Sequence, residues 1–158
     1  MINNKTYQVL SVSKTQNESP ISDYFNTYLS MNPKIGNLMF EVHYDSPVRG
    51  IIPIPNAKVT ISKLLGDDYY LSKVITTNDN GETEPIQLPT VSRDLSLKPG
   101  EGRVFSTYQA SVEAPGYIRK DIYDVQIFEG ITSVQNINLQ PSPANQGVQA
   151  GPASISMG

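Results

Sequence analysis

The sequence predicts an all-β protein built as a sandwich of short strands, and three observations lead to that fold class. Apolar and polar residues alternate along several segments between residues 36 and 140, as they do in half-buried strands. The chain of 158 residues contains 12 Pro and 11 Gly, a content typical of many turns between short strands. Asn80-Gly81 stands between two alternating segments and is the strongest short hairpin signal in the chain. We therefore expect a seven-stranded antiparallel β-sandwich over residues 36–140, with a short N-terminal helix and extended terminal arms.

The predicted strands follow from the alternation and from the turns that interrupt it. They occupy residues 38–44, 57–61, 70–77, the segment that returns from Asn80-Gly81 to Leu88, and residues 104–112, 118–128 and 132–139. Residues 46–55 are expected to form a turn-rich link and residues 89–103 a long loop. Pro85 restricts the returning strand to a sheet edge or a bulge, because proline has no N–H to donate to a ladder. Ala114-Pro-Gly-Tyr117 is expected to form a tight turn.

Residues 1–18 form a polar N-terminal arm that contains one strand candidate, residues 7–12. In an extended chain Tyr7 and Val9 share one side, and Leu10 and Val12 share the other. Two interpretations stay open for this strand. It pairs with the edge of its own sheet, or it is donated to the open sheet edge of a neighbouring subunit. We take these four residues as candidates for a subunit interface.

Residues 19–35 are expected to hold a short amphipathic helix and a linker. One apolar side of this helix is formed by residues at i, i+3, i+4, i+7 and i+8: Ile21, Tyr24, Phe25, Tyr28 and Leu29. Ser22 is a candidate N-cap. So short a helix needs a surface to dock on, either the chain's own sheet or a neighbouring subunit, so the last four of these residues are further interface candidates.

Residues 141–158 form a tail of unusual composition. The chain carries no charged residue from position 130 to its last residue, and Val148 and Ile155 are among the few larger apolar groups of the tail. Such a segment is either disordered or, because it has no charge to desolvate, part of a subunit interface. Val148 and Ile155 therefore complete the set of candidate interface residues.

Composition and charge exclude several partners and leave localisation open. The formal net charge is −3 and basic residues occur singly, so no cluster could neutralise a run of phosphates and we expect no nucleic acid partner. No apolar run is long enough to cross a bilayer, and the first residues lack the apolar core of a secretory signal. The chain is expected to assemble in the cytoplasm or to reach the outside by release from the cell.

The sequence offers little material for catalysis or for a metal site. With no cysteine and one histidine, thiol nucleophiles and multi-histidine metal sites are excluded. His43 falls on the polar side of its strand and is expected to be exposed to solvent. Asp79 and Glu82 could offer oxygens to calcium, but their spacing matches no EF-hand loop, so we interpret them as turn residues. We expect no enzymatic activity, no cofactor and no metal.

Four motifs follow one another in the order of a known family: Gly36-Asn-Leu-Met-Phe-Glu-Val42, Pro55-Asn-Ala-Lys-Val-Thr-Ile61, Thr76-Thr-Asn-Asp-Asn-Gly81 and Ala114-Pro-Gly-Tyr117. In these motifs the chain resembles the carboxypeptidase-regulatory-like, or transthyretin-like (prealbumin-like), β-sandwich, with Asn78 or Asp79 in place of the usual Asp. Residues 84–89, 108–112 and 125–128 are similar to the β-domain that accompanies clostridial spore cortex-lytic enzymes. The resemblance covers residues 36–140 and implies an accessory module without catalytic residues of its own.

Together these observations lead to the hypothesis of a non-enzymatic structural subunit. It would assemble with copies of itself, by strand donation from its terminal arms, into a filament or a surface layer on a bacterial spore or cell. One alternative is a module that binds cell-wall carbohydrate or peptidoglycan, which the nine tyrosines indicate. A further alternative is a component of a phage virion, which also needs no signal peptide.

Overall fold

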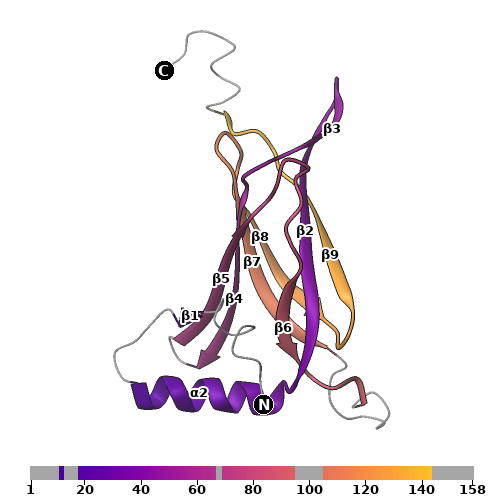
Figure 1. Cartoon of the computed structure of the whole chain (residues 1–158). Helices are drawn as coiled ribbons and strands as arrows, with labels where there is room; N and C mark the ends of the chain where they lie inside the picture. Colours follow the sequence, from indigo (N-terminus) through magenta and orange to yellow (C-terminus); the bar gives the residue numbers. More distant parts are fainter. Residues whose placement is uncertain (1–10, 13–17, 67–68, 95–104, 144–158) are drawn as a thin grey trace.

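The computed structural model describes residues 11–12, 18–66, 69–94 and 105–143 (Figure 1). The secondary structure consists, in chain order, of β1 (Ser11–Val12), α2 (Glu18–Met31), β2 (Lys34–Ser46), β3 (Gly50–Pro53), β4 (Lys58–Gly66), β5 (Tyr69–Thr76), β6 (Ile86–Thr90), β7 (Ser106–Glu113), β8 (Lys120–Ile127) and β9 (Thr132–Asn138). The strands form two sheets that face each other, and α2 lies across one end of them. The prediction of an all-β sandwich is confirmed.

One sheet has five strands in the order β1-β5-β4-β7-β8, all antiparallel. The other sheet is organised around the long strand β2. Along one edge of β2, β6 pairs with its first part, from Lys34 to Leu38, and β3 pairs with its last part, from His43 to Ser46. Strand β9 pairs with the other edge of β2 and runs parallel to it. The prediction of a purely antiparallel sandwich of seven strands is therefore wrong in two details: the described residues form nine strands, and one pair is parallel.

The core lies between the two sheets and is formed by the side chains that the alternation predicts to point inward. The largest of them, Phe40, is fully buried, which contributes about 1.5–3 kcal/mol relative to an exposed ring. The same buried cluster contains residues from both sheets: Leu38, Val42, Val59, Ile61, Leu88, Tyr108, Val112, Val125, Ile127 and Ile137. Among the residues whose burial is described, those of the core run from Tyr28 in the helix to Leu139 after the last strand.

The Asn80-Gly81 turn does not close a β-hairpin, which corrects the prediction made from it. Strand β5 belongs to the five-stranded sheet, whereas β6 pairs with β2 in the other sheet. The segment between them crosses from one sheet to the other and docks on β2, where the N–H of Val42 donates to the carbonyl oxygen of Gly81 at 2.7 Å. Gly81 has φ +77°, so the dipeptide does mark a positive-φ turn, but the two strands that it joins are not neighbours.

Residues 46–55, predicted to be an irregular link, contain strand β3. Strand β2 extends past Tyr44 to Ser46, and β3 pairs with it from Ser46↔Gly50 to His43↔Pro53. Gly50, at φ +79°, ends the turn of this hairpin. The hairpin projects from the end of the sandwich opposite α2 (Figure 1). The later turn at Ala114–Tyr117 is confirmed, with Gly116 at φ +84° and the Tyr117 N–H donating to Ala114 O at 3.1 Å.

Helix α2 docks on its own chain through the predicted apolar side. Tyr28 is buried, its hydroxyl is hydrogen-bonded to the hydroxyl of Tyr108, and Phe25 and Leu29 pack against the core. After the helix ends, buried Asn32 accepts a hydrogen bond from the Ser106 hydroxyl. The helix begins at Glu18, so Ser22 lies inside it and is not the N-cap. Within the described part of the chain, no helix is long and apolar enough to cross a membrane.

Candidate functional site

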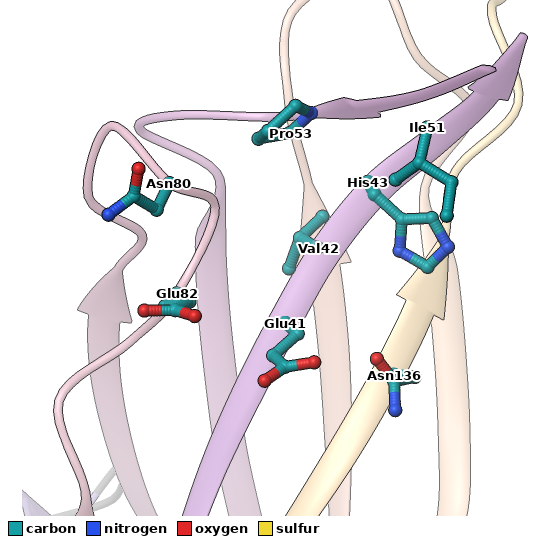
Figure 2. A pocket seen from close by; sticks show the side chains of 8 residues that line it. All are labelled: Glu41, Val42, His43, Ile51, Pro53, Asn80, Glu82 and Asn136. Atoms are coloured by element: carbon teal, nitrogen blue, oxygen red, sulfur yellow. The ribbon is translucent and has the colours of Figure 1, made fainter.

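A shallow cavity of about 390 Å³ opens on the outer surface of the sheet that contains β2 (Figure 2). Its lining combines acidic, amide, imidazole and apolar side chains: Glu41, Val42, His43, Ile51, Pro53, Asn80, Glu82 and Asn136. These residues come from β2, β3, β9 and the turn between the two sheets. Concave sites with a few convergent polar groups are the usual places for ligands, so this cavity is the candidate functional site.

The strand register explains why these side chains meet. Residues of β2 alternate between the core and the outer surface, so Glu41 and His43 both point outward. Asn136 of β9 lies beside Glu41 in the parallel ladder, and Pro53 of β3 lies beside His43. Glu82 forms an isolated antiparallel bridge with Glu41, which brings two carboxylate side chains to adjacent positions. Figure 2 shows Glu41 between Glu82 and Asn136.

The turn that carries Asn80 and Glu82 is fixed by its own hydrogen bonds. The side-chain oxygen of Asn78 accepts from the backbone N–H groups of Asn80 at 2.9 Å and of Glu82 at 3.0 Å. The Gly81 N–H donates to the carbonyl oxygen of Asn78 at 2.9 Å. An Asn side chain that bonds to the following backbone in this way stabilises a tight turn. Asn78, rather than Asp79, therefore takes the position of the turn-forming residue.

His43 is less exposed than the sequence predicts. Its side chain is 20% exposed, and Nε2 lies 3.2 Å from the Asp45 carboxylate two residues along the same strand. Asp45 is itself 54% exposed, so this is a surface pair and not a buried one. The pairing restrains the imidazole at the rim of the cavity, beside Ile51 and Asn136 (Figure 2).

The chemistry of the cavity is that of a binding surface with an acidic bias. Glu41 and Glu82 supply acceptor oxygens, and Asn80 and Asn136 supply both donors and acceptors. Among the described residues, no Lys or Arg lines the cavity, and neither does a hydroxyl or thiol that could act as a nucleophile. Over the described residues, no group of three or more His, Cys, Asp or Glu side chains could hold a metal ion. Asp79, considered with Glu82 for calcium, is not part of the lining.

The candidate interface residues of the arm and the helix lie elsewhere in the fold. Val12 is in β1, where it pairs with Leu71 of β5 in the same chain. Tyr24 lies against Gly66 at the end of β4, and the other three helix residues contact the chain's own core. The remaining candidates lie outside the described residues: Tyr7, Val9, Leu10, Val148 and Ile155. A single chain does not test contacts between subunits, so the interface stays a prediction.

Comparison with known proteins gives no family and only distant structural likeness. No family model matches the chain, and no curated protein matches it. Among solved structures, the minor pilin GBS52 of Streptococcus agalactiae is 13% identical at a TM-score of 0.47, over 78% of this chain and 48% of that one. The Bacillus anthracis TIE protein is 16% identical at 0.44, over 68% and 17%. Catechol 1,2-dioxygenase from Pseudomonas arvilla C-1 is 14% identical at 0.43, over 79% and 59%.

At these scores the likenesses carry no function to this chain, and the chain spans less than two thirds of each protein named. The assignment as a β-sandwich rests on the two sheets described above.

The sequence alone did not single out Glu41, Ile51 or Asn136 as members of a site. The alternation of its strand predicts that Glu41 points outward. The same alternation does not predict which residues lie beside Glu41, because these depend on β9 lying parallel to β2 and on the turn crossing between the sheets. No local signal in the sequence encodes either pairing.

Proposed function

We propose that this chain is a non-enzymatic structural subunit that assembles with copies of itself through its N-terminal arm. The observation that supports the proposal is the pairing of the N-terminal arm with the outer edge of β5. Strand β1 lies antiparallel to β5 through the pairs Ser11↔Ser72 and Val12↔Leu71. The other edge of β5 is paired with β4, so among the described residues β1 is the outermost strand of the five-stranded sheet. An extended segment that pairs with the edge of a sheet is the arrangement that strand donation uses.

The described core lies in the part of the chain after the arm, so arm exchange is proposed to leave that core intact. Its buried residues run from Tyr28 to Leu139. Asn32 and Tyr28 hold the end of α2 to β7 through Ser106 and Tyr108, so the helix stays with its own sandwich. The exchangeable unit is then the arm before α2, and the same β5 edge receives it from a neighbouring copy. Each fully buried Val or Leu side chain of the arm would contribute about 1.5–3 kcal/mol.

The order of the sequence motifs supports a transthyretin-like accessory module as the folded unit. Gly81 and Gly116, the turn glycines of two of those motifs, both have positive φ. A module of this kind suits a role in assembly. The resemblance to the β-domains of spore cortex-lytic enzymes favours the surface of a bacterial spore or cell as the location.

Deleting residues 1–12 tests the proposal, because it removes the arm strand and leaves α2 and the core intact. The full-length chain is expected to form polymers visible by negative-stain microscopy, and the truncated chain to remain folded without polymerising. A synthetic peptide of residues 1–16 should bind the truncated chain but not the full-length chain, whose β5 edge is occupied. Polymers of unchanged length from the truncated chain would rule out the arm as the connector.

A second candidate function, binding of cell-wall carbohydrate, is favoured by the polar cavity. Glu41, Glu82 and Asn136 present oxygens and amide groups to an open concave surface, and Ile51 supplies an apolar wall. Replacing both Glu41 and Glu82 by Ala should abolish retention on purified peptidoglycan if the cavity is the site. Asp79→Ala is the control, because Asp79 lies in the same turn but outside the lining. Equal retention of both variants would exclude this function for the cavity.

A further inference from the structure

We propose that the free edge of β9 pairs with the same edge of a second copy, so that the two β2-containing sheets join into one continuous antiparallel sheet. This contact goes beyond the proposed function, because it uses neither the arm nor β5. It follows from three properties of β9: its unpaired backbone groups, its composition, and the symmetry of its register.

The hydrogen bonds to β2 show which backbone groups of β9 face the free edge. The Asn37 N–H donates to Ile131 O at 2.9 Å, and the Leu139 N–H donates to His43 O at 2.8 Å. In a parallel ladder, alternate residues of a strand bond to one neighbour, so the odd-numbered residues from 131 to 139 face β2. The even-numbered residues, Thr132, Val134, Asn136 and Asn138, direct their N–H and C=O groups away from β2. No other strand pairs with β9 in the described part of the chain. Directly beyond β9, the Ile118 N–H donates to Gln140 O at 2.8 Å, so the free edge extends from Thr132 to Asn138.

The composition of β9 lacks the features that protect an edge from pairing. Its sequence, Thr-Ser-Val-Gln-Asn-Ile-Asn, has no charge and no proline, and its ladder with β2 runs without a register shift. Natural edges are normally blocked by charges, prolines or bulges. Strand β9 is therefore an edge that can accept a further strand.

The edge strand of the opposite sheet, β8, provides the contrast within the same molecule. The Ser133 hydroxyl donates to Gln126 O at 3.3 Å, so the edges of β8 and β9 lie on the same side of the sandwich. Strand β8 carries Lys120, Asp121 and Asp124, and its register with β7 is interrupted where Asp124 has φ +60°. A charged, bulged edge resists pairing. Of these two neighbouring edges, only β9 is open.

The register of β9 makes a second copy the matching partner. About a two-fold axis at Gln135, Thr132 lies opposite Asn138 of the second copy, and Val134 lies opposite Asn136 of the second copy. All of these residues direct their backbone groups to the free edge, so each pair can exchange two hydrogen bonds. Every opposing side chain is neutral, so self-pairing brings no like charges together. Val134, now 43% exposed, gains a cross-strand neighbour.

Cysteine cross-linking tests this register directly, because the chain has no cysteine of its own. In the proposed pair, the two copies of residue 135 face each other as a non-hydrogen-bonded pair with Cα atoms about 4.5 Å apart, within disulfide range. The full-length Gln135→Cys variant should oxidise to a covalent dimer of twice 17.4 kDa on a non-reducing gel. Ser133→Cys is the matched control: it faces the same side of β9, but its two copies would lie about 13 Å apart along the strands and should not cross-link.

A charge pair gives a second test that does not depend on oxidation. Val134→Lys combined with Asn136→Lys places lysines directly opposite each other and should weaken the dimer at least about tenfold in dissociation constant. Val134→Lys combined with Asn136→Glu places opposite charges directly opposite each other, so this variant should keep the dimer. Failure of Gln135→Cys to cross-link above the control, or equal behaviour of the two charge variants, would overturn the proposal. Both tests use the full chain with its arm. They can therefore fail while arm exchange is observed, and arm exchange can fail while both tests succeed.

Discussion

Replacing Gly81 by alanine tests whether the turn between the two sheets depends on close contact with β2. A Cβ built on Gly81 would lie far inside contact distance of the Val42 carbonyl oxygen and 3.2 Å from the Ile54 nitrogen. Both are backbone atoms of paired segments, so neither can rotate away as a side chain could. The substitution must therefore move the turn off β2 or distort the β2–β3 pairing.

The expected loss has two parts. At φ +77° an alanine is disfavoured by about 1–2 kcal/mol in the folded chain. Alanine also reduces the conformational entropy of the unfolded chain, which offsets about 0.4–1 kcal/mol of this loss. Moving the turn also lengthens the 2.7 Å hydrogen bond from Val42 N to Gly81 O, and leaving these buried groups unpaired costs about 1–3 kcal/mol. We expect Gly81→Ala to lower the free energy of unfolding by about 3 kcal/mol, mostly through the second part.

Gly50→Ala is the matched control, because Gly50 has nearly the same φ, +79°, and no atom within 4 Å of a built Cβ. It should lose only the conformational part, about 1 kcal/mol. Urea unfolding followed by circular dichroism, with the slope checked for constancy, measures both variants. Equal losses in the two would refute the reasoning, because they would mean that the turn does not need its close approach to β2.

Three further substitutions test other parts of the structure. Thr77→Val removes a buried hydroxyl that donates to Ile54 O at 2.7 Å and accepts from Ala57 N at 2.9 Å; it should cost about 2 kcal/mol in urea unfolding, and Thr77→Ser should not. Tyr28→Phe removes the hydroxyl bonded to Tyr108 and should cost about 1 kcal/mol, so an unchanged melting temperature would show that the pair adds nothing. Burial lowers the pKa of Lys73, so the unfolded chain keeps that proton to a higher pH than the folded chain. The free energy of unfolding of the wild type should therefore increase as pH rises toward 10.5, because Lys73 loses its proton in the folded chain first. The Lys73→Met variant should lack this increase.

The alternation of side chains predicted the core well because it depends only on local geometry. Phe40 and Val42 are buried where the period of two places them, and Glu41 is on the outer surface between them. Tyr28 and Leu29 contact the core because helical spacing puts them on one side. In each case the sequence distance between the residues is short, and the pattern determines direction without any knowledge of tertiary pairing.

The partner of each strand was not predictable from local pattern. Asn80-Gly81 indicated a hairpin, since the dipeptide favours positive φ, and the structure does place Gly81 at positive φ. Whether the chain then returns beside β5 or crosses to β2 depends on long-range packing. Here the chain crosses: Ile86 and Leu88 pair with β2 in the other sheet and their side chains are buried in the core. The cavity formed by Glu41, Glu82 and Asn136 depends on that crossing, which is why the sequence did not reveal it.

The two proposed contacts lie on opposite sides of the sandwich, and this position determines what they can build together. The five-stranded sheet begins with β1 and β5, where the arm pairs, and ends with β8, which lies beside β9. A two-fold contact closes on itself, so pairing at β9 alone produces a dimer and nothing larger. Arm exchange at β5 adds a second contact on the far side of each subunit, and two such contacts on opposite edges extend without closing. Loss of the arm should therefore leave dimers, loss of β9 pairing should leave only arm-linked species, and loss of both should leave monomers of 17.4 kDa.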